Sequence, residues 1–316
     1  MIKVQIENKA FAKPYNVTTL ITSLNFSDSL NDGCSKLEFS YLNEGMVFPN
    51  GSLVRFVYGT TNVFCGYIFS YERSESREIS AVAYDQIRYL KAKDTMVIKD
   101  MRADELIAAI AAKFQLKVGT LANTGYKLPV AVKDNQTYLD MIYEALSNTL
   151  VSNKKKFAFY DNYGVLQLTD LMDMRLPLAI GDDSLATSYK YGQSIDENTY
   201  NLIKLSRENE DTGKREIYIA QDSNSFKQFG MLQYFEAVDK NSNPEQIKAK
   251  ADALLKLMNS ETKSMSVDAI GDIRIRAGCG IIARVEELDL KNYLLVKSCK
   301  HSFKSNLHTM SLELVL

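Results

Sequence analysis

Residues Asn198–Asp222, NTYNLIKLSRENEDTGKREIYIAQD, together with Ala269–Leu316, decide the fold that the sequence predicts. The first stretch contains two runs typical of β-strands, Asn201–Arg207 and Arg215–Ala220, joined by the polar turn Glu208–Lys214. The second stretch contains several more predicted strands. A helical pattern separates the two stretches. We therefore expect their strands to pair across a long connection and to close a β-barrel with an inserted helix.

The composition is that of a globular protein with room for more than one domain. The chain has 316 residues, of which 46 % are hydrophobic and 24 % are charged, and its formal net charge is −1. Domains commonly contain about 150 residues, so the chain is long enough for two. The near-neutral charge does not favour a nucleic-acid clamp, and no window reaches the roughly 18 apolar residues of a membrane span. Residues 1–11 lack the apolar core of a signal peptide, which predicts a protein made in the cytoplasm.

The cysteines give no sign of a disulfide framework or a metal site. The four, Cys34, Cys65, Cys279 and Cys299, are scattered and show no CxxC spacing. In a chain without a secretion signal, we expect free thiols that pack as small hydrophobic side chains. The sequence also contains 18 Tyr and 14 Phe but no Trp, which suits sheet surfaces and large subunit contacts.

Residues 1–91 are predicted to form a first β-barrel domain. Apolar and polar residues alternate along Ile2–Ile6, Leu20–Phe26 and Ser35–Tyr41, which is the period of a half-buried strand. Turn signals recur at roughly ten-residue intervals, as is typical of a small barrel or sandwich. Further strands are predicted over Ser52–Tyr58, Val63–Arg73 and Arg77–Tyr84, with a polar turn at Ser74–Ser76 between the last two.

Residues 92–187 are predicted to form a small α+β insertion module. One helix is expected over Asp100–Phe114, with Asp100 as its cap. A second is expected over Thr137–Leu150, with Thr137 as its cap. In both segments the apolar residues fall on one helical face. A hairpin is expected from Lys156–Tyr160 and Gly164–Leu168.

Residues 188–316 are predicted to form a second β-barrel domain. Its inserted helix, Asn243–Asn259, has the clearest local signals in the sequence. Asn243 stands at the cap, Pro244 at the first helical position and Gln246 three residues after the cap. The predicted fold class is therefore α+β and mainly β, with two small β-barrels, an α+β insertion and a helix inserted in the second barrel.

A weak internal echo supports two similar halves. The run Gly51-Ser-Leu-Val-Arg-Phe-Val resembles Gly280-Ile-Ile-Ala-Arg-Val. A predicted strand pair follows each run, over Val63–Tyr84 in the first half and Tyr293–Val315 in the second. Because antiparallel hairpins of equal length look alike by chance, the echo suggests a duplication without proving one.

The two histidines, His301 and His308, are the first candidates for a chemical site. Their spacing fits a hairpin with its tip at Lys304–Leu307, so the two side chains could face each other. Two histidines alone do not make a metal site, and no cysteine or carboxylate stands at ligand spacing beside them. Core or strand-surface histidines are the commoner interpretation by a wide margin.

Other candidate catalytic groups lack partners in the sequence. Cys279 or Cys299 with His301 would suggest a cysteine nucleophile, but no third, orienting residue stands out. The acidic pairs are better explained as helix starts or solvated turns, because adjacent residues point apart. These pairs are Asp104-Glu105, Asp182-Asp183 and Glu286-Glu287. Nucleotide-binding, zinc-protease and serine-hydrolase motifs do not occur, so the sequence assigns no catalytic, cofactor-binding or metal-binding residue.

Several short runs, spread over nearly the whole chain, carry a resemblance to a known family. They are Ala83-Tyr-Asp-Gln-Ile-Arg-Tyr-Leu-Lys, Asn123-Thr-Gly-Tyr-Lys, Ile195-Asp-Glu-Asn-Thr-Tyr-Asn-Leu-Ile-Lys, Gly230-Met-Leu-Gln-Tyr, Ala251-Asp-Ala-Leu-Leu, Gly271-Asp-Ile-Arg-Ile-Arg-Ala-Gly and His308-Thr-Met-Ser-Leu. In this order they resemble the tail hub proteins of contractile-tailed phages and phage-derived particles of Gram-positive bacteria, the XkdQ/YqbQ type. That family is related to the myophage baseplate hub.

The resemblance implies a structural protein and not an enzyme. It implies a homotrimer on the baseplate axis, in which each chain contributes two tube-like barrels to a ring that joins the sixfold tail tube to a threefold spike. The implied partners are other copies of the chain, the tail tube protein, the spike protein, a LysM-type baseplate protein and the tape-measure protein. DNA would pass only transiently through the bore, and neither a membrane nor a cofactor is implied.

The implied location is the tail baseplate of a phage, a defective prophage or a contractile bacteriocin, after synthesis in the bacterial cytoplasm. Two other functions stay open. A tail-associated cell-wall hydrolase would need a buried nucleophile or paired carboxylates at working distance. A peripheral carbohydrate- or receptor-binding tail protein would suit the tyrosine content. The hub is favoured because its resemblance covers most of the chain, whereas the alternatives depend on composition.

Overall fold

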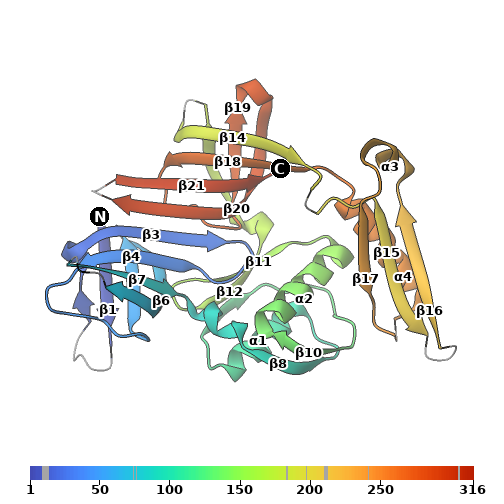
Figure 1. Ribbon diagram of the computed structural model, residues 1–316, viewed down its shortest axis with the longest axis horizontal. Helices are drawn as coiled ribbons and strands as arrows, with labels where there is room; N and C mark the ends of the chain where they lie inside the picture. The colour runs from blue at the N-terminus through green and yellow to red at the C-terminus, as the bar shows by residue number, and fades with distance from the viewer. Residues whose placement is uncertain are drawn as a thin grey trace.

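One mixed sheet of 13 strands organises the molecule (Figure 1). The computed structural model describes residues 1–8, 14–73, 75, 77–182, 184–196, 198–209, 213–240, 242–304 and 307–316. The strands of the sheet are β1 (Ile2–Glu7), β2 (Tyr15–Asn16), β3 (Ile21–Ser29), β4 (Lys36–Leu42), β5 (Leu53–Tyr58), β6 (Thr61–Arg73), β7 (Glu78–Tyr84), β13 (Arg175–Gly181), β14 (Ala186–Ser194), β18 (Thr262–Ile270), β19 (Gly280–Val285), β20 (Leu290–Lys304) and β21 (Leu307–Val315). The prediction of a mainly β protein is confirmed.

The strands of this sheet form two sets with the same order. The first set runs β3-β4-β7-β6-β5-β1 and the second β14-β18-β21-β20-β19-β13, and each keeps the same succession along the chain. Only the last strands differ in direction, since β1 is antiparallel to β5 whereas β13 is parallel to β19. Antiparallel pairing joins the edge strand β3 of the first set to residues 298–303 of β20 in the second set. We call this ladder the inner seam.

Bulges at equivalent points strengthen the correspondence between the two sets. In β6, the ladder with β7 shifts between Ile68 and Ser70. In β20, the ladder with β21 shifts between Val296 and Ser298. A bulge bends its strand and increases the local twist, so the two bulges mark equivalent bends in the sheet. Before its bulge, β6 also pairs with β5, and β20 also pairs with β19.

The two runs of the sequence echo lie at equivalent places in the two strand sets, but the register suggested by the sequence is shifted. Gly51 and Gly278 both have a positive φ, of 84° and 91°. Their N–H groups donate to the carbonyls of Ile68 and Val296, the residues just before the two bulges. Gly51 therefore corresponds to Gly278 and not, as the sequence suggested, to Gly280. Glycine suits both positions because an L side chain rarely adopts this backbone conformation.

Two expectations about the strands are wrong. Among the described residues the ladders run as an open path from β14 to β2, so neither half closes into a barrel by itself. The described residues of Asn198–Asp222 do not pair with the described strands of Ala269–Leu316 either. The predicted hairpin is present as β15 (Leu202–Asn209) and β16 (Lys214–Gln221), but with β17 (Gln233–Ala237) it forms a separate three-stranded sheet. Part of its turn, Glu208–Lys214, lies outside the described residues, as do parts of Ser74–Ser76 and Lys304–Leu307.

The helices follow their local signals closely. α2 (Tyr138–Asn153) begins after Thr137, whose side chain accepts the N–H of Asp140, and α4 (Pro244–Met258) begins after Asn243, which caps it in the same way. α1 (Ala103–Lys113) is preceded by Arg102 instead of the predicted cap, Asp100. Asp100 has a φ of 53°, so it lies before the cap in a left-handed turn. The short helix α3 (Ser223–Phe229) was not predicted.

Smaller elements build the rest of the molecule. Strands β8 (Lys93–Ile98) and β10 (Ala131–Thr137) form a ribbon, and β9 (Val118–Leu121), β11 (Phe157–Asp161) and β12 (Leu166–Asp170) form a sheet that confirms the predicted hairpin. The 3₁₀ helices are η1 (Thr18–Leu20), η2 (Gln86–Lys91), η3 (Leu171–Met174) and η4 (Glu286–Leu288). No helix within the described ranges has the length and apolar character needed to cross a membrane.

Separate hydrophobic cores underlie these parts. One lies beneath the first strand set and one beneath the second, while a third joins α1 and α2 to β11 and β12. The fourth is small and packs α4 against β15 and β16. This last unit stands at one side of the molecule (Figure 1). The division at residues 91 and 187 stays a prediction.

Candidate functional site: the polar face of the large sheet

Polar side chains predominate on one face of the large sheet. Along β3 the alternate residues Leu24 and Phe26 are buried, and along β21 so are Met310 and Leu312. The residues between them point to the opposite side, because successive side chains of a strand alternate. The ladders align these residues across the sheet in a row that consists of Ser188, Asp268, Ser311, Lys300, Ser27 and Lys36. We call this side of β14, β18, β21, β20, β3, β4, β7 and β6 the polar face.

Hydrogen bonds between neighbouring strands hold the polar face together. The Ser302 hydroxyl donates to Asn25 Oδ1 at 2.7 Å across the inner seam. The Ser311 hydroxyl donates to Asp268 Oδ1 at 2.6 Å, and the hydroxyls of Ser40 and Ser80 lie 2.9 Å apart. Cross-strand pairs of this kind fix the register of a sheet. On this face the hydrogen bonds therefore link β20 to β3, β21 to β18 and β4 to β7.

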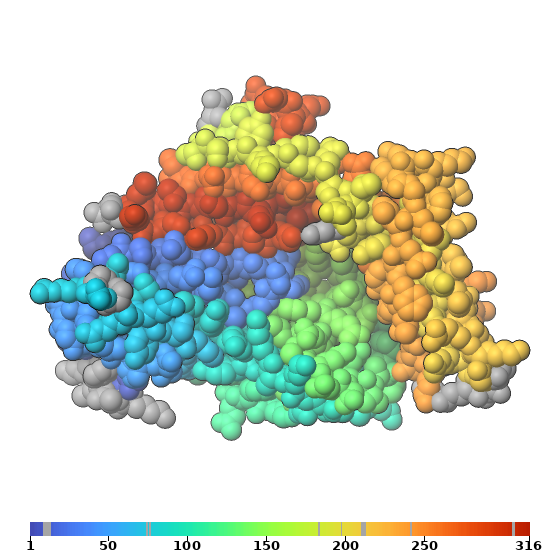
Figure 2. All heavy atoms as spheres, in the orientation of Figure 1, coloured from blue at the N-terminus to red at the C-terminus, as the bar shows by residue number. Residues whose placement is uncertain are grey.

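Charges of both signs are interspersed on the polar face. Its basic residues are Lys36, Lys190, Lys300 and Lys304, and its acidic residues are Glu38, Glu72, Glu78, Asp268 and Glu313. A shallow depression in the face is lined by β3, β18, β20 and β21. Figure 2 shows the surfaces of these strands as adjacent bands, with the orange and red C-terminal strands beside the blue N-terminal ones. An evenly mixed surface of this kind does not bind polyanions strongly.

The eight-strand layer that carries the polar face has two open edges. At one end, β14 has β18 as its only hydrogen-bonded neighbour within the described chain. At the other end, the part of β6 beyond its bulge pairs with β7 alone among the described strands. Open edges of this length are pairing sites for another strand.

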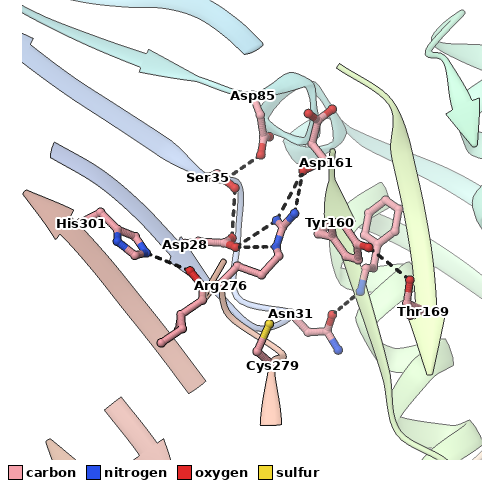
Figure 3. Close-up of polar contacts among 12 residues, drawn as sticks. Asp28, Asn31, Ser35, Asp85, Tyr160, Asp161, Thr169, Arg276, Cys279 and His301 are labelled. Atoms are coloured by element: carbon pink, nitrogen blue, oxygen red, sulfur yellow. Dashed lines mark hydrogen bonds and ion pairs between the residues drawn. The ribbon is translucent and has the colours of Figure 1, made fainter. Parts of the chain in front are cut away.

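A buried polar cluster behind the inner seam connects three of the cores (Figure 3). Arg276 lies between the two strand sets, and its guanidinium nitrogen Nη2 is 2.9 Å from Asp28 Oδ2. The guanidinium also lies over the Tyr160 ring, 3.9 Å from its centroid. The Ser35 hydroxyl donates to Asp28, while the Ser35 N–H donates to Asp85. These contacts tie β3, β11 and the segment before β19 into one unit.

Two further carboxyl groups at this cluster are perturbed. Asp85 caps η2 and accepts the N–H of Ile87, and Asp161 accepts a hydrogen bond from Gln86 at 2.7 Å. Burial, with the nearby Asp161 as a second cause, raises the pKa of Asp85 to about 8. Burial likewise raises the pKa of Asp161. The cluster thus contains one arginine and three buried acids, which favours a neutral form of at least one of these acids.

The histidines face each other, as expected, but in a packed core. His301 Nε2 donates to the Ile275 carbonyl at 2.9 Å, and His301 Nδ1 lies 3.0 Å from His308 Nε2. The His308 ring stacks on Phe303 with centroids 4.2 Å apart. Burial, followed by the effect of His301, lowers the pKa of His308 to about 4. Both rings are buried, so they are neutral structural residues near pH 7.

The other candidate residues, the cysteines and the acidic pairs, lie in surroundings that support the fold. Burial raises the pKa of the thiols of Cys279 and Cys299, which is the opposite of what a nucleophile needs. Asp104 accepts hydrogen bonds from the N–H and hydroxyl of Thr124. Asp182 accepts the N–H of Glu286 at 2.8 Å. Asp183 lies outside the described residues, and within the described ranges no group of three His, Cys, Asp or Glu residues could hold a metal ion.

Sequence comparison finds one family and two relatives from Bacillus subtilis. The family described as YQBQ-like matches residues 24–315. The uncharacterised protein YqbQ of Bacillus subtilis strain 168 is 32 % identical over 270 residues, which cover 84 % of this chain and 81 % of YqbQ. The phage-like element PBSX protein XkdQ of the same organism is 28 % identical over 268 residues, with the same two coverages.

Structure comparison finds the same fold in tail proteins. The 43 kDa tail protein of prophage MuSo2 from Shewanella oneidensis matches with a TM-score of 0.71 and 11 % identity, over 99 % of this chain and 98 % of that one. The c3393 protein of E. coli matches with a TM-score of 0.61 and 9 % identity, over 98 % of this chain and 76 % of that one. It is described as a type VI secretion component with structural similarity to the T4 tail proteins gp27 and gp5. At such identities the likeness shows the fold.

Proposed function

The chain belongs to the YqbQ-like family, and from its fold we propose that it is the structural hub of a contractile phage-type tail. Three copies form an axial ring that joins the sixfold tail tube to a threefold spike. The observation that carries this proposal is the open eight-strand layer, which has a polar face on one side and hydrophobic cores on the other. At each end its edge has no further partner among the described strands. A layer of this kind is completed by closure with other copies.

Geometry supports a wide bore. Three copies of the eight-strand layer give three times eight, or 24, strands. At about 4.8 Å between strands the circumference is about 115 Å and the diameter about 37 Å, and strand tilt widens the ring further. Side chains on the inner side narrow this opening, yet it stays wide enough for a DNA duplex or an extended protein. The closed barrel expected within each chain thus arises between chains.

The polar face lines this bore. Its serines are short and its charges are mixed, so a passing polyanion meets no continuous basic track. The apolar side of the layer must face outward, because the hydrophobic cores and the helices lie there. The two insertions, with α1 and α2 in one and α4 in the other, then stand outside the tube wall. They are available to other baseplate proteins.

The repeat explains how one ring serves two symmetries. Each chain carries two strand sets of the same order, so three chains present six similar sets to a sixfold tube. The insertions differ between the sets, and they keep the threefold repeat that a spike requires. The proposed partners are therefore the tail tube protein, the spike protein, a LysM-type baseplate protein and the tape-measure protein. The proposed location is the baseplate of a phage or phage-like particle.

The proposal is tested by the mass and symmetry of the assembled protein. Light scattering on the full chain at high concentration is expected to give three times the 35.7 kDa chain mass. Class averages of purified particles are expected to show a threefold ring at the end of the tube. A monomer at every concentration, together with particles that lack such a ring, would overturn the proposed function.

A further inference from the structure

The two open edges of the eight-strand layer match each other through the internal repeat. In the aligned strand sets, β6 takes the place of β20, and β14 takes the place of β3. Since β20 pairs with β3 inside the chain, we propose that β6 of one copy pairs with β14 of the next in the same antiparallel register. We call this contact the outer seam. The inference rests on the proposed ring and names the residues that close it.

The exposure of equivalent side chains indicates a missing strand at both edges. On β6, Tyr71 is 41 % exposed, whereas its counterpart on β20, Cys299, is 2 % exposed. On β14, Tyr189 is 37 % exposed, whereas its counterpart on β3, Leu24, is fully buried. These tyrosines point to the core side of the layer, where the inner seam excludes water. Large side chains left half open at both edges are typical of an interface.

The bulges fix the register of the outer seam. Ser70 follows the β6 bulge as Ser298 follows the bulge of β20. The β14 ladder with β18 shifts at Thr187, and the β3 ladder with β4 shifts at Thr22. The inner-seam pairs Ser298–Ser29, Cys299–Asp28, Lys300–Ser27 and His301–Phe26 then translate into the outer-seam pairs Ser70–Ser194, Tyr71–Gln193, Glu72–Gly192 and Arg73–Tyr191.

The side chains that this register brings together are complementary. Inside the chain, His301 stacks on Phe26 with centroids 6.2 Å apart. At the outer seam Arg73 takes the place of His301 and Tyr191 that of Phe26, which makes a cation–π contact. On the polar face, Glu72 lies diagonally from Lys190, within reach of an ion pair. The paired positions therefore offer attraction on both sides of the layer.

A second copy is the occupant that these edges favour. Both halves of the outer seam are present on every chain, one at each end of the layer, so the contact is head-to-tail. Head-to-tail contacts close into a ring when the rotation between copies allows it. The inner seam already provides the turn from one strand set to the next. If nearly the same rotation between neighbouring strand sets is repeated at the outer seam, six sets close into a circle.

Paired cysteines test the register in the full chain. The variant Tyr71→Cys/Gln193→Cys places the two thiols directly opposite each other across the outer seam, and the control Tyr71→Cys/Tyr189→Cys moves one thiol by four residues. Both are made with Cys34→Ala and Cys65→Ala, because those natural thiols are only partly buried. Mild oxidation is expected to link the matched pair into covalent trimers at least about tenfold more efficiently than the shifted pair, since a disulfide needs Cα atoms within about 7 Å.

The outcomes separate the seam from the ring. Light scattering on the same samples reports whether the chain is trimeric. A trimer in which only the shifted pair links overturns the register, and a trimer in which neither pair links overturns the seam while the proposed function stands. A chain that remains monomeric at high concentration and in purified particles overturns both. Each single-cysteine variant, which cannot bridge the seam, is expected to give no covalent trimer.

Discussion

The inner seam and the open edges of the same sheet differ in what covers them. At the inner seam, β20 and β3 bury their core-side residues, among them Phe26 and Cys299. At the open edges, the counterparts Tyr191 and Tyr71 are half-buried or exposed. The inner seam also contains the buried ion pair of Asp28, whose counterpart on β14 is the uncharged Gln193. The ladder within the chain is thus reinforced, whereas the proposed outer seam would join positions that the isolated chain leaves partly exposed.

The largest expected effect separates the two kinds of seam with one pair of substitutions. Phe26→Ala should lower the free energy of unfolding of the isolated chain by about 3 to 4 kcal/mol, because a large side chain is removed from a closed core. Tyr191→Ala, at the equivalent position, should cost about 1 kcal/mol or less in the isolated chain, since it is only partly covered there. Urea denaturation at low protein concentration measures both.

In assembly, the variant with the smaller effect on folding should have the larger effect. Tyr191→Ala is expected to abolish the trimer in light scattering, because the outer seam loses the partner of Arg73. Equal losses of unfolding free energy for the two variants would contradict the comparison, since they would mean that the edges are already closed in the isolated chain.

Arg276 and Arg274 provide a matched test of the reinforcement behind the inner seam. Both lie in the loop before β19 and both pair with an aspartate, but the Arg276 side chain is 21 % exposed and that of Arg274 is 61 % exposed. Arg276→Met should cost about 3 kcal/mol, because it leaves Asp28 buried without its partner. Arg274→Met should cost about 0 to 1 kcal/mol. Thermal and urea unfolding of the two variants would show comparable losses if the buried cluster did not stabilise the seam.

The pH dependence of stability tests the excess of acid at this cluster. The pKa of Asp85 is raised from an ordinary value of 3.8 to about 8 in the folded chain. At a pH between these two values, folded Asp85 therefore keeps a proton that the unfolded chain has released. Stability should therefore fall as pH rises across this window, by at most about 1.4 kcal/mol per pH unit for one group. Asp85→Asn is expected to flatten this fall.

The control for this experiment is another aspartate that caps a 3₁₀ helix. Asp170 caps η3 and accepts the N–H of Met172, as Asp85 caps η2. Asp170→Asn removes a capping carboxylate of the same kind outside the buried cluster, so the difference between the two variants isolates the contribution of the cluster. Urea unfolding at stepped pH distinguishes the two variants, and an identical slope for Asp85→Asn and the natural chain would contradict the raised pKa.

Local signals predicted the pieces of this fold better than their arrangement. Thr137 and Asn243 cap helices that begin where expected, since a cap and the turn after it are contiguous in sequence. Strand pairing depends on partners far apart in the chain, so alternation alone could not tell that β20 joins β3 instead of closing back on its own set. The hairpin of β15 and β16 was found, while its isolation from the large sheet was not.

The polar cluster shows the same limit. Arg276 and Asp28 are 248 residues apart, and nothing near either residue indicates the pairing. The only signal was indirect: Arg276 falls in Gly271-Asp-Ile-Arg-Ile-Arg-Ala-Gly, one of the runs that carry the family resemblance. The duplication was visible as an echo, yet its register became clear only from the equivalent glycines and bulges.

The smallest expected effect concerns charge at the outer seam. Glu72→Lys replaces an attraction to Lys190 by a repulsion, which should weaken each seam by about 0.5 to 1 kcal/mol, because the pair is exposed and diagonal. Lys190→Glu in the same chain should restore the affinity. Glu38→Lys is the matched control, since Glu38 lies on the polar face within the first strand set, away from both edges. Light scattering over a dilution series measures trimer dissociation at low and high salt. Two outcomes would contradict a contact between β6 and β14. Glu38→Lys could weaken the trimer as much as Glu72→Lys, or the double variant could fail to restore the affinity. Either result would mean that the charge of the whole polar face governs assembly.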